Sequence, residues 1–242
     1  MLFAPRPPDR TGPEQIALGD PPLLVTIRRS ARARRLTLRL AAGTGAATVT
    51  APPRVGLREI RRFLTAHEGW LAERRARLPG PVVPCPGASL TLRGRTVALT
   101  RTDGRRVHHA GDELAVPGRD DAAFRGKLLG WLRETARTEA AAACDRHAAA
   151  LERGYARLTI RDPRSRWGSC TSAGNIMLSW RLILAPEEVL DYVAAHEVAH
   201  LAEMNHSPAF WAVVARLSPD YETPRRWLRR EGAALHRFRF SD

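Results

Sequence analysis

The segment His196-Glu197-Val198-Ala199-His200 decides how the rest of this 242-residue chain is interpreted. Residues four apart lie on one face of a helix, so His196 and His200 can direct their imidazoles at one point, as two ligands of a zinc ion would. Glu197 cannot share that face, but its carboxylate can reach a water on the metal and act on it as a general base. This H-E-x-x-H pattern therefore predicts a helix that carries a hydrolytic zinc site.

The residues before this motif predict the helix that the motif requires. Pro186 followed by Glu187 and Glu188 is typical of a helix start, because proline suits the first turn and acids interact favourably with the helix N-terminus. Val189 and Val193 belong to an apolar stripe that a packed helix would bury. The pentapeptide alone also occurs in helices whose histidines make only ordinary hydrogen bonds. The flanking pattern favours the zinc interpretation over that one.

His206 is the predicted third ligand. Its distance from His196 equals the spacing in H-E-x-x-H-x-x-G-x-x-H, but Glu203 stands where that pattern has glycine. Glutamate adopts the sharp turn of such a glycine poorly, whereas Asn205 tolerates a left-handed backbone. We therefore expect the helix to end at Asn205 and Ser207-Pro208 to begin the next helix. Glu203 remains the rival ligand if the first helix continues.

Composition argues against a membrane or secreted protein. No window approaches the ~18 consecutive apolar residues of a membrane span. Residues 1–22 contain proline and charge without an apolar core, so we expect a loose tail that is neither a secretory signal nor an anchor. The cysteines Cys85, Cys144 and Cys170 are scattered and lack C-x-x-C spacing. This cysteine usage predicts a reducing, cytoplasmic location.

The chain is strongly basic, with 39 Lys and Arg residues against 25 Asp and Glu residues and a net charge of +14. Such a charge raises the hypothesis of a nucleotide or nucleic-acid partner. However, Lys127 is the only lysine, and no aromatic-interleaved basic groove or known nucleic-acid motif is present. The arginine content is interpreted as coding bias, and an anionic partner stays a secondary hypothesis.

Residues 23–118 show the period-two alternation of strands, with one helix among them. Strands are expected at Leu23–Ile27, Arg35–Leu40, Ala47–Thr50, Leu90–Leu92, Thr96–Leu99 and Glu113–Val116. The helix is expected over Gly56–Leu78, where apolar residues recur every three or four positions. We therefore predict a strand-rich N-terminal region that ends at residue 118.

Residues 119–242 are predicted to complete an α+β fold as its catalytic core. The expected order is a long helix over Arg119–Arg153 that stops at Gly154, a small antiparallel sheet, the H-E-x-x-H helix and a closing C-terminal helix over Ser207–Leu217. In the sheet, Thr171–Asn175 has the composition of a hairpin turn. The sheet edge and the histidine face would border a cleft, where the edge strand pairs with an extended peptide.

Further motifs resemble those of the YgjP-like metallopeptidase family, relatives of the SprT-like zincins. The resemblance rests on Ser165-Arg166-Trp167-Gly168-Ser169-Cys170, Trp180–Pro186, His196–His200 with Asn205-His206-Ser207, Phe210-Trp211, Asp220-Tyr221 and Arg226-Trp227-Leu228. It extends from Leu23 to Arg237 and includes the strand-rich start. What the resemblance implies is a zinc-dependent hydrolase with a zincin-like core.

Three residues in or near these motifs are candidate substrate contacts. Trp167 and Ser169 belong to a segment that is expected to face the zinc helix and line the cleft; alternatively, Trp167 packs on that helix and Gly168 permits close approach of its backbone. Tyr221 is a candidate for stabilising an oxyanion, or for packing. Cys170 is interpreted as a buried apolar side chain, because a zinc-activated water already supplies the nucleophile.

Three functions follow from these residues. The leading hypothesis is a zinc metallopeptidase that cleaves peptides or proteins. The second is a metal-dependent hydrolase of nucleoside triphosphates or another phosphorylated substrate, which arginines would bind; no glycine-rich phosphate loop or acidic magnesium cluster supports it. The third is a non-catalytic module that zinc stabilises. Glu197 argues against the third, because a purely structural zinc site needs no general base.

Overall fold

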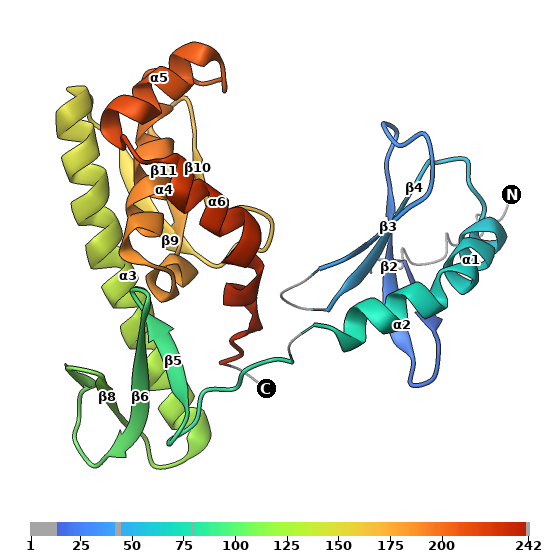
Figure 1. Ribbon diagram of the computed structural model, residues 1–242, viewed down its shortest axis with the longest axis horizontal. Helices are drawn as coiled ribbons and strands as arrows, with labels where there is room; N and C mark the ends of the chain where they lie inside the picture. The colour runs from blue at the N-terminus through green and yellow to red at the C-terminus, as the bar shows by residue number, and fades with distance from the viewer. Residues whose placement is uncertain (1–13, 42–44, 79, 241–242) are drawn as a thin grey trace, which may run out of the picture. The chain divides into compact units, whose positions relative to one another are not determined.

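The computed structural model describes residues 14–41, 45–78 and 80–240, and the chain divides into two compact units between Gly80 and Pro81 (Figure 1). Residues 1–13 of the predicted tail lie outside the described residues. Residues 15–18 form a strand, so ordered structure begins earlier than predicted. Within the described ranges, no helix has both the length and the apolar character that crossing a bilayer requires.

The first unit is a four-stranded sheet covered by two short helices. Its strands, in the order β1-β2-β4-β3, are β1 Gln15–Leu18, β2 Leu23–Arg29, β4 Ala47–Ala51 and β3 Thr37–Leu40. β2 and β4 are parallel, and the outer strands pair with them in antiparallel fashion. Val25 and Val49 of the sheet share a core with Ile60 and Leu64 of α1.

The single helix predicted over Gly56–Leu78 is wrong, because the structure has two helices, α1 Leu57–Ala66 and α2 Glu68–Ala76. His67 separates them. Its Nδ1 lies 2.8 Å from the carbonyl oxygen of Phe63, which the backbone N–H of residue 67 would bond in a continuous helix. That N–H donates instead to Leu64 O at 3.0 Å. The apolar periodicity continues across this break, so the sequence did not reveal it.

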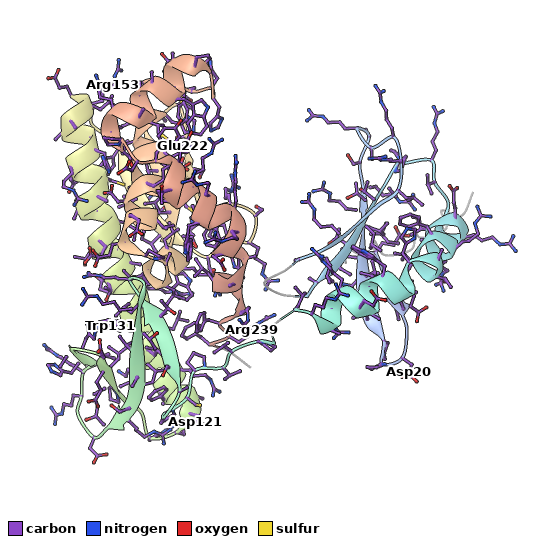
Figure 2. All side chains as sticks on the ribbon, in the orientation of Figure 1. Asp20, Asp121, Trp131, Arg153, Glu222 and Arg239 are labelled. Atoms are coloured by element: carbon purple, nitrogen blue, oxygen red, sulfur yellow. The ribbon has the colours of Figure 1, made fainter. Side chains whose placement is uncertain are left out.

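The second unit is arranged along one long helix, α3 Asp121–Leu151 (Figure 1), whose side chains are drawn in Figure 2. A four-stranded sheet packs near its start, in the order β5 Ser89–Leu92, β6 Arg95–Thr102, β8 Glu113–Pro117 and β7 His108–Ala110. Side chains of this sheet and of α3 belong to the same apolar core as the rest of the unit. The predicted boundary after residue 118 therefore falls inside this unit, between β8 and α3.

The second half of this unit contains a smaller sheet and the remaining helices. They are β9 Arg157–Arg161, β10 Gly168–Cys170, β11 Asn175–Ser179, the 3-10 helix η1 Trp180–Leu184, α4 Glu187–Ala199, α5 Pro208–Leu217, α6 Glu222–Glu231 and the 3-10 helix η2 Gly232–Arg237. This order of helix, small sheet and helices confirms the predicted α+β class.

Two details of this half differ from the prediction. The sheet is mixed, since β11 pairs with β10 in antiparallel and with β9 in parallel fashion. The long helix ends at Glu152, whose φ of 56° is left-handed, two residues before the glycine that was expected to stop it. The N–H of Arg153 then donates to Ala148 O, which caps the helix by the pattern that usually selects glycine.

Arg181 of η1 links the C-terminal segment to the end of the small sheet by hydrogen bonds. Its guanidinium donates to both oxygens of Asp162, at 2.6 and 3.0 Å, and to the carbonyl oxygens of Leu235 and Phe238, at 2.8 and 3.1 Å. Burial alone would raise the pKa of the Asp162 carboxyl, but the hydrogen bonds and charge of Arg181 outweigh burial and hold that pKa below its ordinary value of 3.8.

Asp162→Asn should lower the free energy of unfolding by about 1–2 kcal/mol at neutral pH, because it replaces a charge-assisted bidentate pair by a neutral one. A carboxyl whose pKa is lowered by folding stabilises the protein above its unfolded pKa and loses that effect as the pH falls through the folded pKa. The difference from wild type in urea denaturation should therefore shrink below about pH 4.

Asp103→Asn, at an exposed aspartate with no ion pair in the described structure, is the matched control and should change little. A loss of stability in Asp162→Asn that stayed constant on acidification would contradict the assignment to this pair.

Candidate metal centre

The H-E-x-x-H residues lie at the end of α4, where the helix tightens into a turn. His200 caps the helix, and the N–H groups of Leu201 and Ala202 donate three residues back, at 2.9 and 3.0 Å. The predicted helix end at Asn205 is therefore wrong by five residues, and Asn205 is absent from the left-handed residues of the described chain. Its side chain instead accepts from the N–H of Ser207, at 2.9 Å.

The start of the next helix is as predicted. Ser207 is the N-cap of α5, its hydroxyl accepts from the N–H of Phe210 at 3.4 Å, and Pro208 occupies the first helical position. His206 consequently sits in a short corner between α4 and α5. The corner turns its side chain back toward the last turn of α4.

The corner brings three histidines together. One ring nitrogen from each of His196, His200 and His206 lies within 4.8 Å of the others. The Nε2 atoms of His196 and His206 are 3.1 Å apart. Two nitrogen ligands of a tetrahedral zinc ion, each 2.0–2.1 Å from the metal, are about 3.3 Å apart. The spacing of these donor atoms therefore fits a small divalent ion that prefers nitrogen ligands.

Hydrogen bonding around His200 fixes which nitrogen can bind a metal. Its Nδ1 lies 2.9 Å from the backbone carbonyl oxygen of Glu203, to which a proton on Nδ1 donates. That bond leaves Nε2 as the nitrogen that could bind a metal, and metal-binding imidazoles are often oriented by a carbonyl group in this way. The rival ligand Glu203 thus contributes its backbone, and its carboxylate does not join the histidine cluster.

Aromatic rings surround His196 and favour its neutral form. His196 contacts Tyr192, Phe210 and Trp211, with ring centroids 4.9–5.9 Å apart. Burial, with repulsion from the other two histidines and from Arg225, lowers the pKa of His196 to about 4. Its Nδ1 is buried without a hydrogen-bond partner in the described structure, so Nε2 carries its polar contacts. Neutral imidazoles are the form that binds a metal.

The side chain of Glu197 packs against a different element, the strand β10. The side chain is 5% exposed and packs against the backbone of Gly168. A Cβ atom at Gly168 would lie 2.6 Å from Cγ and 2.8 Å from Cδ of Glu197, so only glycine leaves room for the carboxylate. Burial raises the pKa of Glu197 to about 8, partly offset by the charge of Arg166. The carboxyl group of Glu197 is therefore held against β10 in a largely dry environment.

The candidate substrate contacts occupy different environments. Trp167 stacks on His236 of η2, with centroids 5.0 Å apart, and is partly buried in the core. Ser169 is half-buried in the middle of β10, next to Gly168. Tyr221 stacks on Trp211 at 5.5 Å and on Tyr192 at 6.4 Å, and both of those rings contact His196. A substrate contact by Trp167, Ser169 or Tyr221 stays a prediction.

Cys170, at the end of β10, is half-buried and not fully buried as expected. Its Sγ donates to the carbonyl oxygen of Thr171 at 3.4 Å, and burial, with the charge of Glu197, raises its pKa. A raised pKa disfavours the thiolate, which is the nucleophilic form.

Arg225 was not predicted from the sequence to lie near the histidines. It is one of four arginines on α6, and nothing in its spacing distinguishes it from Arg226, Arg229 or Arg230. Only the packing of α6 against α4 identifies it.

Convergent histidines on and after an H-E-x-x-H helix that also carries a buried glutamate are typical of the metal centre of a metallohydrolase. Residues 34–231 match the model of the YgjP-like metallopeptidase domain, which is most of the chain. The protein therefore belongs to the YgjP-like metallopeptidase family, as the resemblance predicted, and this membership implies a hydrolase with a catalytic metal.

Other comparisons add little. Among solved structures, the crystal structure of the metallopeptidase zymogen of Pyrococcus abyssi abylysin is similar, at 21% identity over 38% of this chain and 95% of that chain. Its TM-score is 0.34, which is too low to support an argument. No curated protein matches the chain.

Gly168→Ala should destabilise the protein by about 1–3 kcal/mol, because the new methyl group overlaps the buried Glu197 side chain. In a Glu197→Ala background the same change should cost far less, since the atoms it meets are gone. Urea denaturation of the two single variants and the double variant measures this coupling. Gly154→Ala, where the methyl group meets open space, is the control. Additive effects of the Gly168 and Glu197 changes would refute the contact.

Proposed function

We propose that this protein is a zinc metallopeptidase in which His196, His200 and His206 hold the metal and Glu197 is the general base. The observation that supports this most directly is the convergence of three imidazoles, with the buried Glu197 next to His196 in sequence, in a chain of a metallopeptidase family. Three protein ligands leave a fourth position for water or substrate, as catalytic zinc sites do. When bound, zinc supplies Lewis-acid activation of a water and of a carbonyl group.

Residues of the chain transfer the proton, make room for the base and limit the access of water. In this proposal Glu197 accepts a proton from the attacking water and later gives it to the departing amine. Gly168 makes that role feasible, because its missing side chain is the space in which the carboxylate lies. The apolar rings of Tyr192, Phe210 and Trp211 limit the access of bulk water to His196, which strengthens electrostatic interactions there.

An extended peptide is the substrate that the sheet next to this centre fits. β10 is an outer strand of the sheet β10-β11-β9 and also packs against α4. An outer strand can bind an extended chain through main-chain hydrogen bonds, which recognise a peptide independently of its sequence. In this proposal Ser169, in the middle of β10, lies along the bound peptide.

The metal assignment predicts about one zinc per purified chain, measured by elemental analysis. His206→Ala should lower zinc occupancy substantially, because it removes one of three ligands. Glu203→Ala should retain zinc, since Glu203 acts on His200 through its backbone carbonyl, which alanine keeps. Full occupancy in His206→Ala combined with loss in Glu203→Ala would reverse the ligand assignment.

Glu197→Gln should reduce peptide hydrolysis by about 10²–10⁴-fold while zinc content stays unchanged, because glutamine keeps the shape of the side chain but cannot accept a proton. Single-turnover assays on an unbiased peptide set, with nucleoside triphosphates screened in parallel, measure the effect. Hydrolysis of a verified peptide substrate at the wild-type rate, with zinc intact, would remove Glu197 from the mechanism. Turnover of triphosphates alone would favour the alternative of a metal-dependent hydrolase of phosphorylated substrates.

A further inference from the structure

Arg225 lies beside the histidine cluster without belonging to it. It is on α6, where its backbone N–H donates to the backbone carbonyl oxygen of Tyr221 at 3.1 Å. Its guanidinium carbon lies 4.2 Å from the centre of the Trp211 ring. That ring is 5.7 Å from the ring of His196 and 6.0 Å from the ring of His206, centre to centre. Trp211 is therefore close to both the histidine cluster and the positive charge of Arg225.

This charge has no acidic partner in the described structure. Two other half-buried arginines of the same unit are paired with acids, Arg181 with Asp162 and Arg93 with Glu139. Arg225 is half-buried too, but it has no ion pair or side-chain hydrogen bond to a described residue. An anionic group arriving at the site would relieve this imbalance.

The geometry of Arg225 suits a carboxylate in particular. A guanidinium that lies over an indole face is held in place by cation–π attraction. Its N–H groups are arranged as a planar fork, which matches the two oxygens of a carboxylate. Because the fork is already oriented by Trp211, little further freedom is lost when it binds. A neutral substrate would gain nothing from this arrangement.

We propose that Arg225 is a specificity residue that binds an acidic side chain of the substrate close to the bond that is cut, so that the enzyme prefers peptides with Asp or Glu at one position. This inference rests on the proposed peptidase function. It adds a substrate class, since nothing in the H-E-x-x-H motif selects among peptides.

The test uses a set of alanine-based, fluorescein-labelled octapeptides in which a single Glu is moved through every position, each paired with a peptide that has Gln there. Binding is measured by fluorescence anisotropy to full-length Glu197→Gln protein, which should bind without cleaving. Hydrolysis by the wild type is measured in parallel. We expect one position at which Glu is favoured over Gln by about tenfold, in binding and in kcat/KM.

Variants at Arg225 then locate the preference, each also made in the Glu197→Gln protein for the binding measurement. Arg225→Gln should abolish the Glu preference, Arg225→Lys should retain part of it, and Arg225→Glu should shift it toward a Lys-containing peptide. Arg226→Gln is the matched control: it removes the same charge from the next residue of α6, whose guanidinium bonds Thr223 instead. This control should leave the preference and the activity unchanged.

The outcomes separate this inference from the proposed function. Peptide cleavage with no Glu preference, or a preference that survives Arg225→Gln, overturns the role of Arg225 and leaves the peptidase intact. Absence of peptide cleavage overturns the peptidase, while the anisotropy measurement still decides whether Arg225 selects acidic peptides. Equal losses in Arg225→Gln and Arg226→Gln would reduce the effect to general charge and would also refute the proposal.

Discussion

The burial of α4 is the constraint on which the rest of the second unit depends. Apolar residues cover most of its circumference, and α3, the small sheet, α5 and α6 surround it. A helix enclosed in this way has little solvent for its polar side chains, so each of them needs a specific partner. Asp191 shows the rule, since it binds His147 at 3.0 Å and Arg146 at 2.9 Å on α3. Burial would raise its pKa, but these partners lower it.

The same rule explains how one short motif can supply both a base and metal ligands. His196 and Glu197 are adjacent in sequence, so they leave the helix in different directions and meet different neighbours. The histidine meets the rings of α5 and the corner that holds His206, whereas the glutamate meets β10. Placing that carboxylate requires glycine at position 168, in a strand where glycine is otherwise unfavourable. The centre is thus a product of packing between elements distant in the chain.

The sequence predicted features that follow local rules and missed those that tertiary contacts decide. The H-E-x-x-H helix, the Ser207-Pro208 helix start and the α+β class were predicted, because capping chemistry and periodicity are local signals. The break at His67, the left-handed Glu152 and the early end of α4 were missed. In each case a backbone carbonyl oxygen has a different hydrogen-bond donor from the one it would have in a continuous helix. The spacing of apolar residues does not encode that difference. The parallel pairing of β9 with β11 was missed for a similar reason, since it joins strands that are not neighbours in sequence.

The arginines of the chain show the same limit of prediction from sequence, and one of them has a proposed function. The high arginine content of the sequence is interpreted as coding bias, and most of the described arginines are exposed or paired with acids. Arg225 differs through its surroundings alone: its guanidinium lies over the Trp211 indole, that indole contacts His196, and no acidic residue of the described structure pairs with it. The proposed catalytic carboxylate is positioned by β10 and the proposed selective charge by α6. Because separate elements hold them, changes on α6 can alter which peptides bind without moving Glu197.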